Sequence, residues 1–190
     1  MKLDEARDQA LDAAENLFYA RGVQAVGMAQ IRDASGLSLK RLYQLFPAKQ
    51  DLVEGYLARR DVRWRRSIAE YTSRHEDSKE QVLAVFDWLR QWFEEPGFRG
   101  CGWINSYGEL GAASPAVTQL VQEHKQAFAD WLIDLVGRTG RPASTGQQIF
   151  LLAEGAMVTA GITGSSSPAA QARDAASVLL AAQASTDSPR

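Results

Sequence analysis

The chain has 190 residues, of which 45% are hydrophobic and 23% charged, a composition typical of a folded protein rather than a disordered one. The formal net charge of -2 does not by itself indicate a nucleic-acid partner, so any basic surface must be local. The single cysteine excludes an intramolecular disulfide, and together with only two histidines it argues against a structural zinc site.

Apolar residues recur at helical spacing along almost the whole chain, which predicts an all-α fold. The first helix is expected to stop at Gly22, and Pro47 is expected to end the third. Ser114-Pro115 marks a helix start, because serine caps and proline takes the first helical position. The nine predicted helices span residues 4–21, 28–35, 39–45, 48–73, 79–95, 104–112, 115–138, 146–162 and 168–184, with breaks at 96–102 and 140–146 and a frayed tail at 185–190.

Two short predicted helices joined at Gly36, after a longer one, form the pattern of a helix-turn-helix. A glycine suits this turn because residues with a β-carbon resist the backbone angle that it needs. Leu37 and Leu42 are expected to anchor the second short helix, so that Lys40 and Arg41 point outward.

Charge is distributed unevenly along the chain. Residues 1–66 hold 12 Lys and Arg against 9 Asp and Glu, a net charge of +3, while the remainder carries a net charge of -5. The basic first third fits a DNA-binding surface, and from charge alone it equally fits an ordinary solvated face.

The residues around this motif resemble those of a known family. The run consists of Ala10-Leu11, Leu17-Phe18, Arg21-Gly22-Val23, Ile31, Ser35-Gly36-Leu37-Ser38, Leu42-Tyr43-Gln44-Leu45-Phe46-Pro47, Ala48-Lys49 and Leu52. In order and register it closely resembles the amino-terminal signature of TetR/AcrR-type transcriptional regulators. The later segments Gly100 to Asn105, Glu109, His124-Lys125 and Glu154 to Ala156 look like the regulatory domain of one branch of that family.

The resemblance implies a homodimer that binds a palindromic operator and releases it when a small molecule enters the carboxy-terminal domain. We expect no cofactor and no metal. Residues 1–47 would form the helix-turn-helix DNA-binding domain and residues 48–190 the ligand-binding and dimerisation domain. The long helix 48–73 would couple the two. Repression is the usual mode of the family.

The DNA-binding residues implied by the resemblance lie on the second and third helices and just beyond them. Lys40 and Arg41 would read bases, where relatives often have a small residue and threonine, while Tyr43 and Lys49 would touch phosphates. Gly27 replaces the usual Ser or Thr cap, so weaker capping of the second helix is expected. The full set is Met28, Ala29, Gln30, Ser38, Lys40, Arg41, Tyr43, Gln44 and Lys49.

Aromatic residues of the carboxy-terminal part are candidates for an effector pocket, or alternatively for the ordinary core. His124 lies in phase with apolar neighbours, so it is either a core histidine satisfied by a neighbour or a polar contact for an effector. Cys101 is either a structural residue or, beside Arg99, a redox-sensing thiol. The pocket candidates are Trp64, Trp88, Trp92, Trp103, Tyr107, His124 and Phe128.

Small residues crowd the last two predicted helices. They allow helix backbones to approach closely, either between two subunits in a four-helix interface or within one chain. The candidates for the dimer interface are Ala153, Gly155, Ala156, Ala160, Gly161, Ala176, Leu179 and Leu180.

The sequence also has to be compared with two other functions, an enzyme and a protein-interaction module. An enzyme is disfavoured, because no nucleophile–base grouping or phosphate-binding glycine loop is suggested. A helical protein-interaction module without DNA binding is the alternative, although it gives the basic first third no purpose. With no signal segment and no apolar run of about 20 residues, we expect a soluble cytoplasmic protein.

Overall fold

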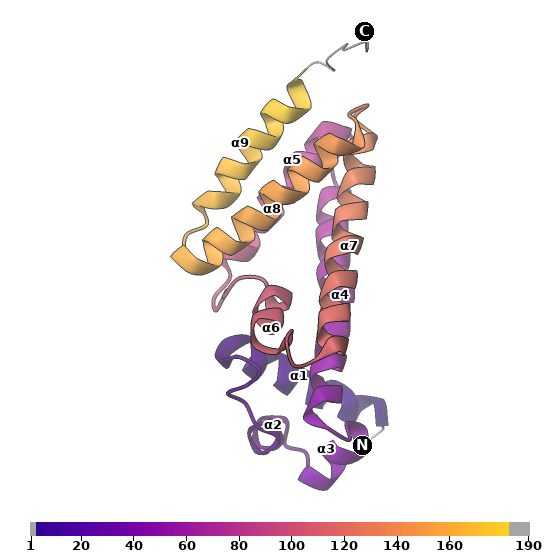
Figure 1. Cartoon of the computed structure of the whole chain (residues 1–190), viewed down its shortest axis with the longest axis vertical. Coiled ribbons are helices and arrows are strands. Elements are labelled where there is room, and N and C mark those ends of the chain that lie inside the picture. The colour runs from indigo at the N-terminus through magenta and orange to yellow at the C-terminus, as the bar shows by residue number, and fades with distance from the viewer. Residues whose placement is uncertain (1–2, 183–190) are drawn as a thin grey trace. The chain divides into compact units, whose positions relative to one another are not determined.

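The computed structural model describes residues 3–182, in which the regular secondary structure is helical (Figure 1). They are α1 (Leu3–Arg21), α2 (Met28–Ser35), α3 (Leu39–Leu45), α4 (Lys49–Thr72), α5 (Ser78–Glu94), α6 (Gly102–Leu110), α7 (Pro115–Gly137), α8 (Ala143–Thr163) and α9 (Ser167–Ala181). The predicted all-α class with nine helices is confirmed for these residues. The predicted end of the last helix at residue 184 and the tail 185–190 lie outside them.

The predicted start and stop residues act as expected. Gly22 and Gly36 have φ angles of 87° and 69°, in the left-handed region that ends a helix. The Ser38 hydroxyl accepts a hydrogen bond from the Arg41 backbone N–H at 3.1 Å, and the Ser114 hydroxyl accepts one from the Val117 N–H at 3.2 Å. These contacts fix the beginnings of α3 and α7.

Two helices, α6 and α8, begin two and three residues earlier than predicted, and in each a glycine taken for part of a break lies inside the helix. A β-carbon on Gly102 would lie 3.0 Å from the Tyr56 hydroxyl, so the start of α6 packs closely on α4. A β-carbon on Gly146 would lie 2.7 Å from the Cα of Ile133, so the first turn of α8 touches the backbone of α7. Both glycines serve close approach rather than helix termination.

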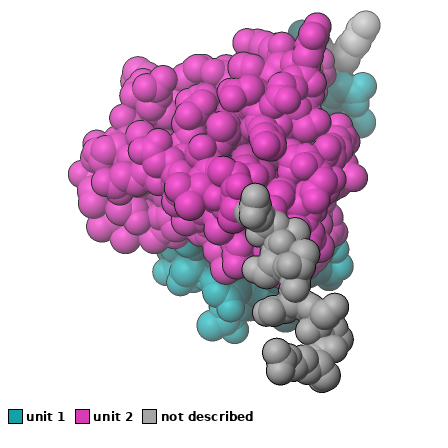
Figure 2. All heavy atoms as spheres, turned by 90° about the horizontal axis from the view of Figure 1, so that it is seen from above, with its two compact units in different colours: residues 1–64, 101–124 teal, residues 65–100, 125–190 magenta. Residues whose placement is uncertain are grey.

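The helices form two compact units, which Figure 2 distinguishes by colour. Among the described residues, the first unit comprises 3–64 and 101–124, and the second comprises 65–100 and 125–182. Helices α4 and α7 contribute residues to both. The predicted division at residue 47 separates a DNA-binding part from a regulatory part by role, and it stays a prediction.

Each unit has its own apolar core. In the first, α2 packs on α1 and α3, and the fully buried side chains include Ile31, Leu42 and Phe46. In the second, α5, α8 and α9 pack on one another, and α5 is buried along most of its length. The helix-turn-helix is therefore packed within the core of the first unit.

Candidate functional site

The helix-turn-helix presents one face of α3 to solvent. Leu42 packs in the core, whereas Ser38, Lys40 and Gln44 are exposed and Arg41 is half-buried. Tyr43 is 46% exposed. A recognition helix requires this division, because one face must pack while the other enters the major groove.

The structure adds Leu39 to this outer face. Its side chain is 37% exposed and lies one turn before Tyr43, so α3 presents apolar surface as well as charge. In the sequence, the four-residue spacing of Leu39 and Tyr43 is what places them on the same face of a helix.

The start of α2 contains three of the residues predicted to bind DNA. The Met28 side chain is buried, so only its backbone can reach a ligand, whereas Ala29 is exposed and Gln30 half-buried. The Gln30 carboxamide oxygen accepts a hydrogen bond from the Gly27 N–H at 2.8 Å. This contact is one half of a capping box, while Gly27 has no side chain to supply the other half.

Lys49 is held in place within the first unit. Its ammonium group donates a hydrogen bond to the Val23 carbonyl at 2.6 Å. Burial lowers the pKa of Lys49, and the nearby Glu109 carboxylate opposes this effect. An ammonium group has three donors, so a phosphate contact from Lys49 remains a prediction alongside this internal role.

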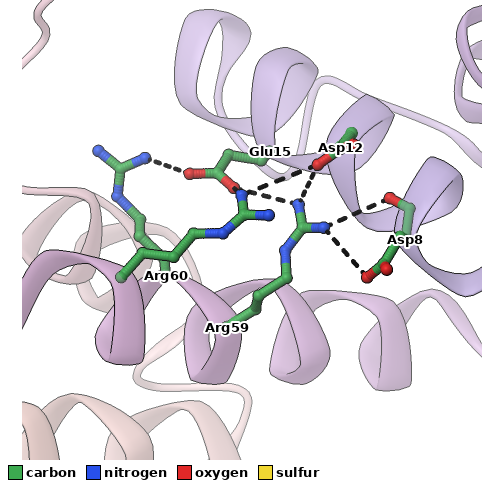
Figure 3. Close-up of polar contacts among 6 residues, drawn as sticks. Asp8, Asp12, Glu15, Arg59 and Arg60 are labelled. Carbon is green, nitrogen blue, oxygen red and sulfur yellow. Dashed lines mark hydrogen bonds and ion pairs between the residues drawn. The ribbon is translucent and has the colours of Figure 1, made fainter. Parts of the chain in front are cut away.

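Arginines of α4 are paired with carboxylates of α1 (Figure 3). Arg59 lies 2.8 Å from an Asp12 oxygen and 3.2 Å from Glu15, while Arg60 lies 2.8 Å from the other Glu15 oxygen. Both guanidinium groups are largely buried, and that of Arg60 also covers the Tyr19 ring at 4.3 Å. These arginines therefore position α1 on α4 and are not displayed for DNA.

Three of the predicted pocket residues meet in the first unit. The His124 ring stacks on Trp103, with ring centroids 3.5 Å apart and planes 4° apart, and its centroid lies 5.3 Å from that of Trp64. Its Nδ1 atom lies 2.6 Å from a carboxylate oxygen of Asp61. His124 is thus buried with a satisfied ring nitrogen, as in the core interpretation.

The other pocket candidates are distributed differently. Trp88 and Trp92 are buried in the second unit with ring centroids 5.6 Å apart, and Phe128, also in that unit, contacts Trp131 and Phe150. Tyr107 is 52% exposed in the first unit. A role for any of these residues in effector binding stays a prediction.

Most of the predicted interface residues are covered within one chain. Five of them are buried within the second unit, where α8 and α9 pack on each other, namely Ala153, Ala156, Ala160, Ala176 and Leu180. Gly155 and Gly161 are exposed and Leu179 is half-buried. A β-carbon on Gly161 would lie 2.8 Å from the Cα of Gly100, so this glycine too serves intrachain packing.

A different row of α8 is apolar and exposed. Leu151, Val158 and Ile162 all face solvent, the last being 79% exposed, and with Gly155 they follow spacings of four, three and four residues. Val178 of α9 is also exposed. We call these five residues the α8–α9 apolar stripe. The heptad-like spacing was the sequence signal for it.

Other kinds of site receive no support from the described residues. Between residues 3 and 182, no group of three or more His, Cys, Asp or Glu is arranged to hold a metal ion. No helix in the same range is long and apolar enough to cross a membrane. Cys101 is buried.

Comparisons with known proteins agree with this architecture. Residues 10–56 match the family of bacterial regulatory proteins described as the tetR family. The chain is 31% identical over 139 residues to the HTH-type transcriptional activator FasR of Mycolicibacterium smegmatis, covering 71% of this chain and 60% of that protein. It is 28% identical over 121 residues to an uncharacterized HTH-type transcriptional regulator of Mycobacterium tuberculosis, covering 60% of this chain and 59% of that one. The chain thus spans about three fifths of the length of these curated relatives.

Solved structures extend the similarity across both units. A TetR-family transcriptional regulator from Streptomyces coelicolor, SCO4454, has a TM-score of 0.86 and 28% sequence identity, covering 93% of this chain and 95% of that one. A TetR regulator from Chloroflexus aurantiacus has a TM-score of 0.82 and 22% identity, covering 95% and 96%, and shows the shared fold. These proteins are described as transcriptional regulators rather than enzymes. Residues 10–56 therefore match the tetR family of bacterial regulatory proteins, and both units share the fold of TetR-family transcriptional regulators.

Proposed function

We propose that the protein is a transcriptional regulator that binds an inverted-repeat operator as a homodimer through residues 38–44 and leaves it when a small molecule binds. The outer face of α3 carries this proposal. It joins exposed polar and cationic side chains to a helix whose opposite face is buried and whose first turn is capped.

Individual residues of α3 suit different parts of duplex DNA. Lys40 and Arg41 can donate to the O6 and N7 acceptors of guanine, and the exposed Leu39 suits the methyl group of thymine. Tyr43 can donate its hydroxyl to a phosphate, which positions the helix without reading sequence.

The α8–α9 apolar stripe supports the homodimer. Exposed leucine, valine and isoleucine side chains in one row gain free energy when a second copy covers them, and a twofold axis lets one surface cover itself. The glycine within the row allows close approach of two α8 helices.

The sign of regulation is proposed as repression, the usual mode of the family. FasR, the relative at 31% identity, is named as an activator. A promoter–reporter assay with and without the regulator decides between the two.

The decisive experiment is selection of operators from random duplexes with purified protein, followed by titration at several salt concentrations. An operator-binding dimer selects an inverted repeat, and the logarithm of its binding constant falls with the logarithm of salt concentration, by about 0.9 per phosphate contact. A protein-interaction module without DNA binding shows neither. Ligand screening for release from that operator then tests the effector, whose affinity must fall by the same factor when operator is bound.

A further inference from the structure

A carboxylate from α6 grips the turn between α1 and α2, residues 22–24. One oxygen of Glu109 accepts a hydrogen bond from the Val23 N–H at 3.1 Å, and the other accepts one from the Gln24 N–H at 2.7 Å. The Gln24 side chain donates back to the Glu109 carbonyl at 2.5 Å. Two successive N–H groups that converge on one anion form a strong, directional contact. We call this arrangement the Glu109 clasp.

The shape of the turn matches the carboxylate. Gly22 has a φ of 87°, which few other residues adopt, and its N–H bonds to the Phe18 carbonyl. A β-carbon on Gly22 would lie 2.9 Å from a Glu109 oxygen. Glycine at this position therefore provides both the backbone conformation and the space for the clasp.

A second group holds the same turn from α4. The Lys49 ammonium donates to the Val23 carbonyl, so the peptide groups around Val23 are bound by a carboxylate from α6 and a cation from α4. Val23 itself is buried. The segment that leads into α2 and α3 is thus fixed by charged side chains rather than by apolar packing alone.

Helix α6 links this clasp to the aromatic group described above. Trp103, at its second residue, stacks on His124, and Glu109 is its next-to-last residue. Trp103 and Glu109 thus lie on one short helix, about 9 Å apart along its axis. All of these residues lie in the first unit.

We propose that Glu109 is a positioning residue for operator binding, which sets the orientation of α2 and α3 by holding the turn 22–24 on α6. The proposal rests on the DNA-binding function proposed above. Glu109 makes no contact with DNA in this account. Its effect is on the geometry with which two recognition helices, about 34–36 Å apart, meet successive turns of the major groove.

The test compares Glu109→Ala and Glu109→Gln with the unaltered protein and with a control, Glu123→Ala. Glu123 is an exposed carboxylate of the same unit that accepts a hydrogen bond from Gln119 on its own helix. Its loss removes the same charge and leaves the turn untouched. The DNA probes are the selected operator and derivatives with one or two base pairs added or removed between half-sites.

We expect Glu109→Ala to bind the best operator about 10-fold more weakly, within the range typical of coupling between distinct sites. Its affinity for the altered spacings falls less, so discrimination among spacings narrows. The salt slope stays unchanged because no phosphate contact is lost. The operator affinity of Glu109→Gln should lie between those of Glu109→Ala and the unaltered protein, since the carboxamide oxygen still accepts a hydrogen bond from one N–H. Glu123→Ala should bind the operator like the unaltered protein.

The proposal is overturned if Glu109→Ala loses the same factor of affinity for every half-site spacing, or if its operator binding is unaltered. Absence of DNA binding by the unaltered protein overturns the proposed function instead, and this inference with it. Amide hydrogen exchange at Val23 and Gln24, measured without DNA, examines the clasp directly. The Val23 and Gln24 amides should exchange faster in Glu109→Ala and Glu109→Gln than in the unaltered protein, at a similar melting temperature. Unchanged exchange at these amides refutes the clasp.

Discussion

A charge placed in the α8–α9 apolar stripe should separate the proposed dimer into monomers. Ile162 is 79% exposed in a single chain, so Ile162→Glu changes little within the subunit. Covering such a side chain contributes about 1.5–3 kcal/mol, and the twofold axis repeats the change on both subunits. We therefore expect a loss of about 3–6 kcal/mol of dimerisation free energy, which weakens the dimer by roughly 100-fold to 10,000-fold.

Sedimentation equilibrium over a range of concentrations measures this change. Val62→Glu is the matched control, because Val62 is an apolar residue of α4 that is 61% exposed and lies outside the stripe. It should leave the dimer dissociation constant unaltered. Equal dissociation constants for Ile162→Glu and the unaltered protein, or a monomeric unaltered protein at micromolar concentration, would refute the proposed interface.

Three further predictions concern the first unit. Arg41→Ala should cost about 1–3 kcal/mol on the best operator and relax discrimination at one base pair, as measured by competition titration, whereas equal weakening on all sequences indicates a phosphate contact only. Asp61→Asn should lower the free energy of unfolding in urea by about 1.5–3 kcal/mol, because it weakens a part-buried charge-assisted hydrogen bond to His124. The exposed Asp134→Asn should cost less than about 1 kcal/mol, and equal losses for the two variants contradict this reasoning. Burial raises the pKa of Tyr56, so above about pH 10 the unfolded chain ionises this residue first and folding stability falls with pH. Tyr56→Phe should lose less stability between pH 9 and pH 11 than the unaltered protein, and parallel pH profiles from thermal melts would contradict this.

Helix signals in the sequence were reliable where the physics is local. Gly22 and Gly36 adopt the left-handed conformation, and Ser38 and Ser114 cap their helices, because each depends on residues within one turn. Glycines with a distant cause were misread. Gly146 looks like part of a loop, yet it lies inside α8, where glycine fits because the backbone of α7 leaves no space for a β-carbon.

The candidate sites show the same limit. The outer face of α3 was predictable apart from Leu39, since it depends on which of seven consecutive residues are exposed. The alanines of α8 and α9 were expected between subunits, but five of the eight named residues are already buried within one chain. A helix rich in small residues can approach another helix closely, but its composition does not say whether that helix belongs to the same chain or to a second subunit.

The net charge of residues 1–66 overstates the number of cations available to DNA. Residues 1–66 carry a net charge of +3, but Arg59 and Arg60 are bound to carboxylates of α1. Pairing leaves the net charge unaltered and removes these cations from the set that is free to approach phosphates. The cations that remain on the recognition helix are Lys40 and Arg41. Because only contacts with phosphates release counterions, the salt dependence of operator binding should correspond to fewer contacts than the twelve basic residues of the segment.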